Sequence, residues 1–135
     1  MANSKSTQMW FAKARQDLKT AKHLHPIEAD FYSGIVFHCQ QCAEKAIKGF
    51  LTFHNVRVLK THDMDKLLSF TVGIDPEISV KFSKIRVFTK YAVEYRYPDA
   101  EMNLPSLDDL AVTDALKIAE DILNYLSDSI PAGEL

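Results

Sequence analysis

The sequence has few residues of the kinds that interrupt helices, form disulfide frameworks or mark export. It has 4 glycines and 5 prolines among 135 residues, and most of them lie between long segments with apolar residues at helical spacing. Its 2 cysteines are too few for a disulfide framework and are expected to stay as thiols. No apolar run approaches the roughly 20 residues that span a bilayer, and the start, MANSKSTQMW, has no apolar signal segment. These absences predict a cytoplasmic helical protein without a membrane segment.

Length and composition indicate one globular domain. A chain of 135 residues can bury roughly two thirds of the surface that it exposes when unfolded, which is enough for one core. Apolar residues make up 47% and charged residues 25%, the ordinary balance of a globular protein. We therefore expect a single domain over residues 1–135.

The charges are distributed unevenly along the chain. The formal net charge is −2, but residues 1–97 hold fifteen Lys and Arg against nine Asp and Glu, and residues 98–135 hold one against nine. The imbalance has two interpretations. Acidic and basic faces of neighbouring helices pair or are solvated, or the basic part forms a surface for phosphate groups while the acidic helix packs elsewhere.

Apolar periodicity predicts five helices: about 7–23, 31–54, 61–68, 78–95 and a last one that opens at "PSLDD". The second has the widest apolar face and should be central. Short loops between the helices indicate an all-α fold, an antiparallel up-and-down bundle of four to five helices. The expected stops and caps are Asn55 as a left-handed stop, Thr61 and Asp75 as caps of the third and fourth helices, and Ser106 with Asp109 as a capping box of the last.

Cys39 and Cys42 have the spacing of zinc and redox motifs, but their context differs from both. They lie inside the second predicted helix, on its apolar stripe. A structural zinc site needs four ligands, and no second Cys or His pair follows; a redox pair would sit at a helix N-terminus after a strand. We expect two buried, inert thiols, no metal site and no cofactor.

Four segments, taken in order, resemble the HEPN domain family: "DLKTAKHL", "CQQCAEKAIKGFL", "THDMDKLL" and "RYPD". The resemblance covers nearly the whole chain. It implies a small up-and-down bundle that commonly forms a homodimer, and the wide apolar face of the second helix favours a dimer as well. It also implies a minimal nucleotidyltransferase as partner, as in many toxin and antitoxin pairs. Many other relatives are metal-independent ribonucleases or bind nucleotides or RNA.

The resemblance also implies a sequence motif by which ribonuclease activity can be predicted. The ribonuclease branch has an Arg followed four to six residues later by a His, and that Arg would be Arg96. No histidine follows in the window, and Asn103 just beyond it cannot move a proton. The same spacing occurs at Arg57 and His62, but in the connection between the second and third helices. His62 there either shapes the start of the third helix or contacts a phosphate.

The candidate residues for nucleotide or RNA binding are Arg96, Tyr97, Asp99, Lys48, Glu44 and His62. Each has a structural alternative. Lys48 and Glu44 form an i,i+4 pair. This pair lies either on a solvated face or at an anion-binding groove that Lys48 shares with Arg96. Arg96 binds an anion or pairs with Asp99 or Glu94.

Three hypotheses about function remain open from the sequence. The leading one is a dimeric HEPN-like module that works with a nucleotidyltransferase and binds a nucleotide or RNA near Arg96. The second is a ribonuclease that uses Arg96 with an unconventional proton carrier, or Arg57 with His62. The third is a helical adaptor with no nucleic-acid role.

Overall fold

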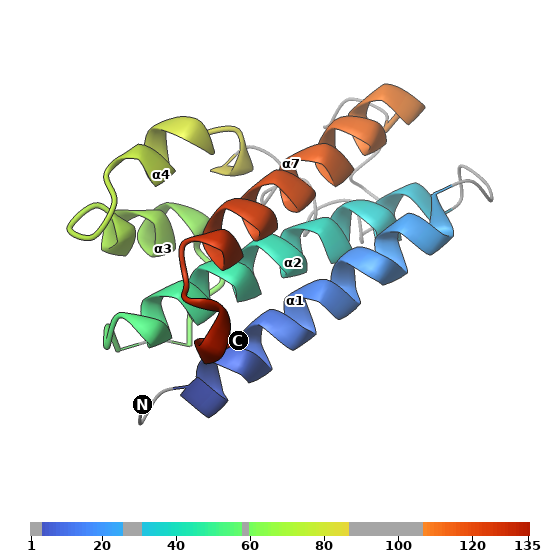
Figure 1. Cartoon of the computed structure of the whole chain (residues 1–135). Coiled ribbons are helices and arrows are strands. Elements are labelled where there is room, and N and C mark those ends of the chain that lie inside the picture. Colours follow the sequence, from blue (N-terminus) through green and yellow to red (C-terminus); the bar gives the residue numbers. More distant parts are fainter. Residues whose placement is uncertain (1–3, 26–30, 58–59, 87–106) are drawn as a thin grey trace.

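Three long helices form the body of the molecule, and two short ones pack beside them at one end (Figure 1). The computed structural model describes residues 4–25, 31–57, 60–86 and 107–135. Helix α1 runs antiparallel to both α2 and α7. Within the described residues there are helices and no strands, so the predicted all-α antiparallel bundle is confirmed. The elements are α1 (Ser4–Leu24), α2 (Tyr32–Phe53), α3 (Met64–Thr71), α4 (Glu77–Lys81), α7 (Asp109–Asp128) and the 3-10 turn η2 (Ala132–Glu134).

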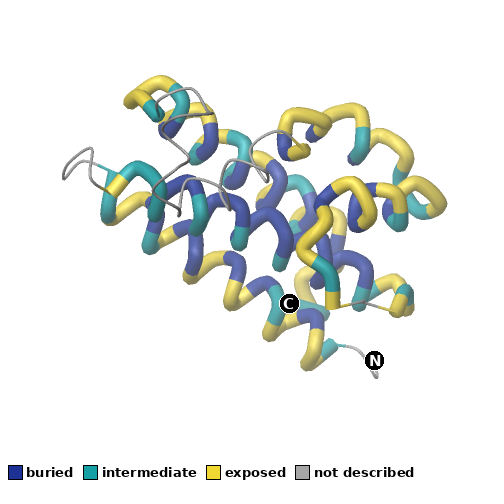
Figure 2. Tube along the Cα trace, turned by 180° about the vertical axis from the view of Figure 1, so that it is seen from behind, coloured by how far each residue is buried: buried dark blue, intermediate teal, exposed yellow. Residues whose placement is uncertain are grey.

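Helix α2 is the central element, as its apolar pattern predicted. It packs most extensively against α1, then against α7 and α3. Its buried residues lie on several sides of the helix, and Figure 2 shows the buried positions facing inward along the long helices. Because one chain already covers this apolar surface, the width of the α2 face gives no independent support for a dimer. The buried apolar residues of α2 are Ile35, Val36, Cys39, Cys42, Ala43, Ala46, Ile47, Phe50 and Leu51.

Two of the predicted helix starts are wrong by a few residues. The Asp63 carboxylate, not Thr61, caps α3 by accepting from the backbone N–H of Lys66. Asp108 caps α7 by accepting from the N–H of Ala111 at 2.8 Å, in place of the predicted capping box. Both aspartates have extended backbones from which a short carboxylate reaches the free N–H groups of the first turn. The predicted left-handed stop is confirmed, since Asn55 has φ 61°.

The predicted fourth helix, 78–95, is interrupted where the structure describes it. Helix α4 ends at Lys81, and Phe82 leaves the helical conformation with φ −114° and ψ 28°. The Phe82 ring packs edge-on against Tyr125 of α7, with ring centroids 5.5 Å apart. Burial of an aromatic ring against α7 therefore competes with helix continuation, and a continuous helix from residue 78 is wrong. The segment from residue 87 lies outside the described residues.

Helices α1 and α2 approach closely at Gly49, and this contact supports a prediction. A Cβ added to Gly49 would lie 2.9 Å from two ring carbons of the buried Phe11 and 3.0 Å from Cβ of Trp10. We expect Gly49→Ala to destabilise the fold by about 1 to 2 kcal/mol, because overpacking exceeds the gain in helix propensity. Gly34→Ala, in the same helix with nothing within 4 Å, should instead be neutral or stabilise by up to about 1 kcal/mol. Urea unfolding of both variants checks this, and equal effects would contradict it.

Candidate functional site

Lys48 and Glu44, predicted from the sequence as candidate ligand contacts, form a buried ion pair on α2. Lys48 Nζ lies 3.3 Å from Glu44 Oε2, and the two side chains are only 6% and 3% exposed. The ammonium also lies over the Trp10 ring of α1, 5.6 Å from its centroid. The prediction of a solvated polar face is therefore wrong at these two positions, since both side chains are buried.

The buried Glu44 carboxylate binds three partners and orients a histidine. It accepts a hydrogen bond from Gln40 Nε2 at 3.1 Å in addition to the contact from Lys48. Its two oxygens lie 3.0 and 3.1 Å from Nδ1 of His62, whose side chain is 76% exposed. A carboxylate accepts hydrogen bonds and donates none, so Nδ1 of His62 carries a proton and donates it to Glu44 in a hydrogen bond. The fold thus brings Glu44, Lys48 and His62 together, as three of the six predicted candidates.

A second cluster of the same kind lies where α1 meets α2. Asp17 of α1 pairs with Lys45 Nζ at 2.6 Å and with Nδ1 of His38 at 3.0 Å. The Asp17 side chain is 12% exposed, so the pairing compensates a nearly buried charge. Asp17 and His38 were not predicted from the sequence to be charge partners. One signal was present, because Asp17 is the single acidic residue of a basic helix and lies on the side that α2 covers.

The remaining candidates lie in a part of the chain that the structure does not describe. Arg96, Tyr97 and Asp99 belong to residues 87–106, so their role stays a prediction. Arg57, the partner of His62 in the displaced motif, is exposed.

Cys39 and Cys42 are both fully buried free thiols, as predicted. Burial raises the pKa of both thiols, that of Cys42 to about 12. The nearby Asp17 carboxylate raises the pKa of Cys42 further, while Lys45 opposes it. A thiol that stays protonated is a poor nucleophile and a poor metal ligand. Among the residues that the structure describes, no group of three or more His, Cys, Asp or Glu side chains could hold a metal ion.

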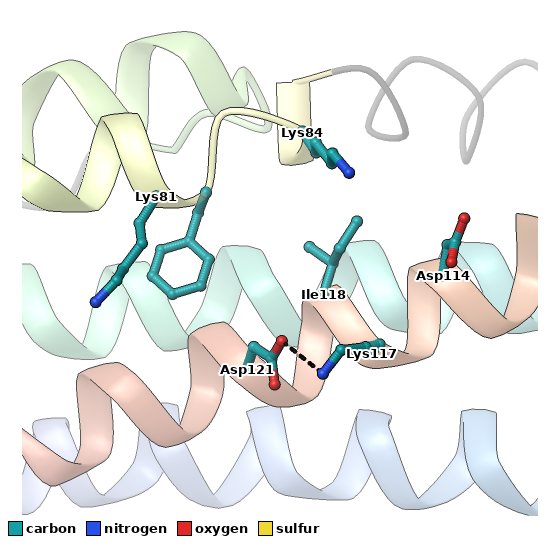
Figure 3. Close-up of a pocket in the computed structure, with 7 residues that line it drawn as sticks. Lys81, Lys84, Asp114, Lys117, Ile118 and Asp121 are labelled. Atoms are coloured by element: carbon teal, nitrogen blue, oxygen red, sulfur yellow. Dashed lines mark ion pairs between the residues drawn. The ribbon is translucent and has the colours of Figure 1, made fainter.

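A cleft of about 410 Å³ lies between α4 and α7, with the Phe82 and Ile118 side chains among its lining residues (Figure 3). Lys81 and Lys84 lie on the α4 side of the cleft and both aspartates lie on α7, where Lys117 pairs with Asp121 at 3.3 Å. Because most of its positive charge is balanced by carboxylates, this cleft has little preference for an anion. The charged residues that line it are Lys81, Lys84, Lys117, Asp114 and Asp121.

None of the helices in the described part of the chain combines the length and apolar character needed to cross a lipid bilayer.

Comparisons with known proteins agree with the fold and with the resemblance noted in the sequence. The protein named "Putative toxin MJ1304" from Methanocaldococcus jannaschii is 28% identical, with 93% of this chain and 89% of the relative aligned. The crystal structure of TT1696 from Thermus thermophilus matches with a TM-score of 0.74 and 28% identity, over 92% of this chain and 98% of that one. The crystal structure of ST0689, an archaeal HEPN homologue, matches with a TM-score of 0.70 and 25% identity, over 93% of this chain and 98% of that one. The sequence model of the HEPN domain matches residues 7–129, so the chain belongs to the HEPN domain family.

Proposed function

We propose that this chain is the HEPN component of a toxin–antitoxin pair, acts with a minimal nucleotidyltransferase as a homodimer, and binds a nucleotide or RNA near Arg96. The observation that carries the proposal is the match of the HEPN domain over residues 7–129, together with a relative that is named as a toxin. Light scattering tests the dimer, and co-purification with a nucleotidyltransferase encoded beside this chain tests the partner.

The chemistry of Arg96 supports binding rather than catalysis. Its guanidinium stays charged at all working pH values and presents a planar set of donors that fits phosphate oxygens. It is a poor proton shuttle because its pKa exceeds about 12. Tyr97 follows Arg96 directly and Asp99 lies three residues after Arg96, and they supply a ring and a carboxylate that could contact a base or a ribose hydroxyl.

We expect Arg96→Ala to weaken binding of a nucleotide or RNA by roughly tenfold to a hundredfold, which corresponds to the loss of a charged hydrogen-bond donor. Arg86→Ala is a suitable control, since Arg86 is a half-exposed arginine paired with Asp65 at 2.7 Å. Fluorescence anisotropy with labelled RNA and calorimetry with ATP measure the two ligands. Equal binding by both variants would argue against a site at Arg96.

One observation favours a ribonuclease as the second candidate function. Glu44 lies 3.0 Å from Nδ1 of the exposed His62, and a carboxylate at this nitrogen is the arrangement that orients a general base. The test is RNA cleavage with a chelator present and without the partner protein. The binding proposal expects no cleavage above background. Cleavage that His62→Gln abolishes would favour the ribonuclease, and cleavage that persists in His62→Gln but not in Arg96→Ala would assign it to Arg96.

A further inference from the structure

A narrow groove of about 250 Å³ runs between α1 and α7, on the flank of α1 away from the Glu44 cluster. On the α2 side, α1 presents Trp10 to Lys48 and Asp17 to Lys45. On the α7 side, Lys22 pairs with Glu120 at 2.8 Å. The two flanks therefore belong to different surfaces of the molecule. The groove is lined by Arg15, Leu18, Lys19, Lys22, Leu123, Asn124 and Ser127.

The groove is strongly basic. Among the lining residues in the described part of the chain three are cationic and none is acidic, although Glu120 compensates Lys22 at the edge of the groove. Arg15 and Lys19 are exposed, and no ion pair forms between either of them and an acidic residue of the described part of the chain. Like charges four residues apart destabilise a helix by a few tenths of a kcal/mol. The two neighbouring cations Arg15 and Lys19, which pair with no acidic residue of the described part of the chain, are therefore better explained by a bound anion than by a contribution to stability.

The other charged residues of α1 also favour an anionic ligand. The helix has one acidic residue, Asp17, which is nearly buried and already paired with Lys45 and with Nδ1 of His38 on α2. The exposed charged residues of the helix are thus all basic, which accounts for part of the positive charge of residues 1–97. The cationic residues of α1 are Lys5, Lys13, Arg15, Lys19 and Lys22.

We propose that this α1–α7 groove binds the phosphodiester backbone of a single RNA strand, without reading its sequence. The cations at Arg15, Lys19 and Lys22 follow each other about 6 and about 4.5 Å apart along the helix axis, so they can contact successive anionic groups of a chain. On the opposite wall, the side-chain amide of Asn124 is a neutral hydrogen-bond donor suited to phosphate and sugar oxygens, whereas the Ser127 hydroxyl donates to the backbone carbonyl of Asn124 at 3.2 Å. Among the described residues that line the groove none is aromatic, so they offer no platform for base stacking. In choosing RNA as the ligand, the inference rests on the proposed function, but its residues are distinct from Arg96.

The experiment compares two double variants of the full chain that lose the same net charge from the same helix. Arg15→Gln/Lys19→Gln removes two groove cations, and Lys5→Gln/Lys13→Gln removes two exposed cations that do not line the groove. Anisotropy with a short labelled uridine oligoribonucleotide is measured from about 50 to about 200 mM salt. We expect the groove variant to bind about tenfold more weakly at the lower salt, with the slope of log K against log salt reduced by about 1.4. The control variant should stay within about twofold of wild type, since its charges act only at long range.

Four outcomes would overturn the inference. If both double variants lose the same RNA affinity, the loss reflects net charge and not the groove. If the wild type binds no RNA at the lower salt, the proposed binding site does not exist. Inorganic triphosphate that competes as well as the oligonucleotide would indicate a site for a small polyphosphate. Polyglutamate that competes equally well would indicate an acidic protein partner. If Arg96→Ala binds RNA as tightly as wild type while the groove variant binds more weakly, the groove is supported and the binding site at Arg96 is contradicted. Failure of the groove proposal and failure of the Arg96 proposal are therefore distinguishable.

Discussion

Lys48→Met should destabilise the fold by about 3 kcal/mol, near the lower end of the range for breaking a buried ion pair. The substitution removes an ammonium whose side chain is 6% exposed and leaves the Glu44 carboxylate, 3% exposed, without its cation. The loss should not be larger, because Gln40 and His62 still contact the carboxylate. The free energy of unfolding from urea titration measures the effect.

The chain offers a matched control for this variant. Lys117 and Asp121 of α7 form another i,i+4 pair at the same distance of 3.3 Å, but their side chains are 76% and 50% exposed. Lys117→Met should therefore change the stability by less than about 0.5 kcal/mol. The double variant Glu44→Gln/Lys48→Met should recover a large part of the loss, since it removes both buried charges. Equal effects of Lys48→Met and Lys117→Met would contradict the buried pair.

The two thiols should make the protein unusually sensitive to alkali. Burial raises the pKa of Cys39 and Cys42 from the ordinary value of 9.0, so the folded state keeps protons that the unfolded state releases. The contribution of the thiols to stability is fully present below pH 9 and is lost as the pH rises from about 9 toward about 12. Each thiol should lower the free energy of unfolding by about 1.4 kcal/mol per pH unit in that window.

The measurement compares wild type with Cys39→Ala/Cys42→Ala by urea unfolding between about pH 8 and about pH 11, a window that brackets the ordinary thiol pKa. Both proteins share the titration of their lysines and tyrosines, so the difference between them isolates the thiols. We expect a constant offset below about pH 9 and then a wild-type curve that falls more steeply, by about 2.7 kcal/mol per pH unit for two thiols. Parallel curves throughout the range would contradict the raised pKa values.

The sequence predicted most of the helical framework, because apolar periodicity depends on residues close together in the chain. It placed α1 and α2 to within a few residues and identified α2 as the central helix. It also placed Cys39 and Cys42 in the core, since both lie on the apolar stripe. It was wrong at α4, where the end at Lys81 coincides with packing of Phe82 against Tyr125, a residue of a distant helix.

The sequence alone thus determined the all-α bundle, the HEPN resemblance and the lack of a histidine after Arg96 in the ribonuclease window. The tertiary structure decided which charges are buried and what they contact. Lys48 is buried because α1 brings Trp10 over it, and His62 is oriented because the chain after α2 returns to Glu44. The basic groove likewise exists only where α7 meets α1. Local spacing sets the face of a helix on which a side chain lies, whereas its partner comes from residues far away in sequence, which only the packed fold brings within reach.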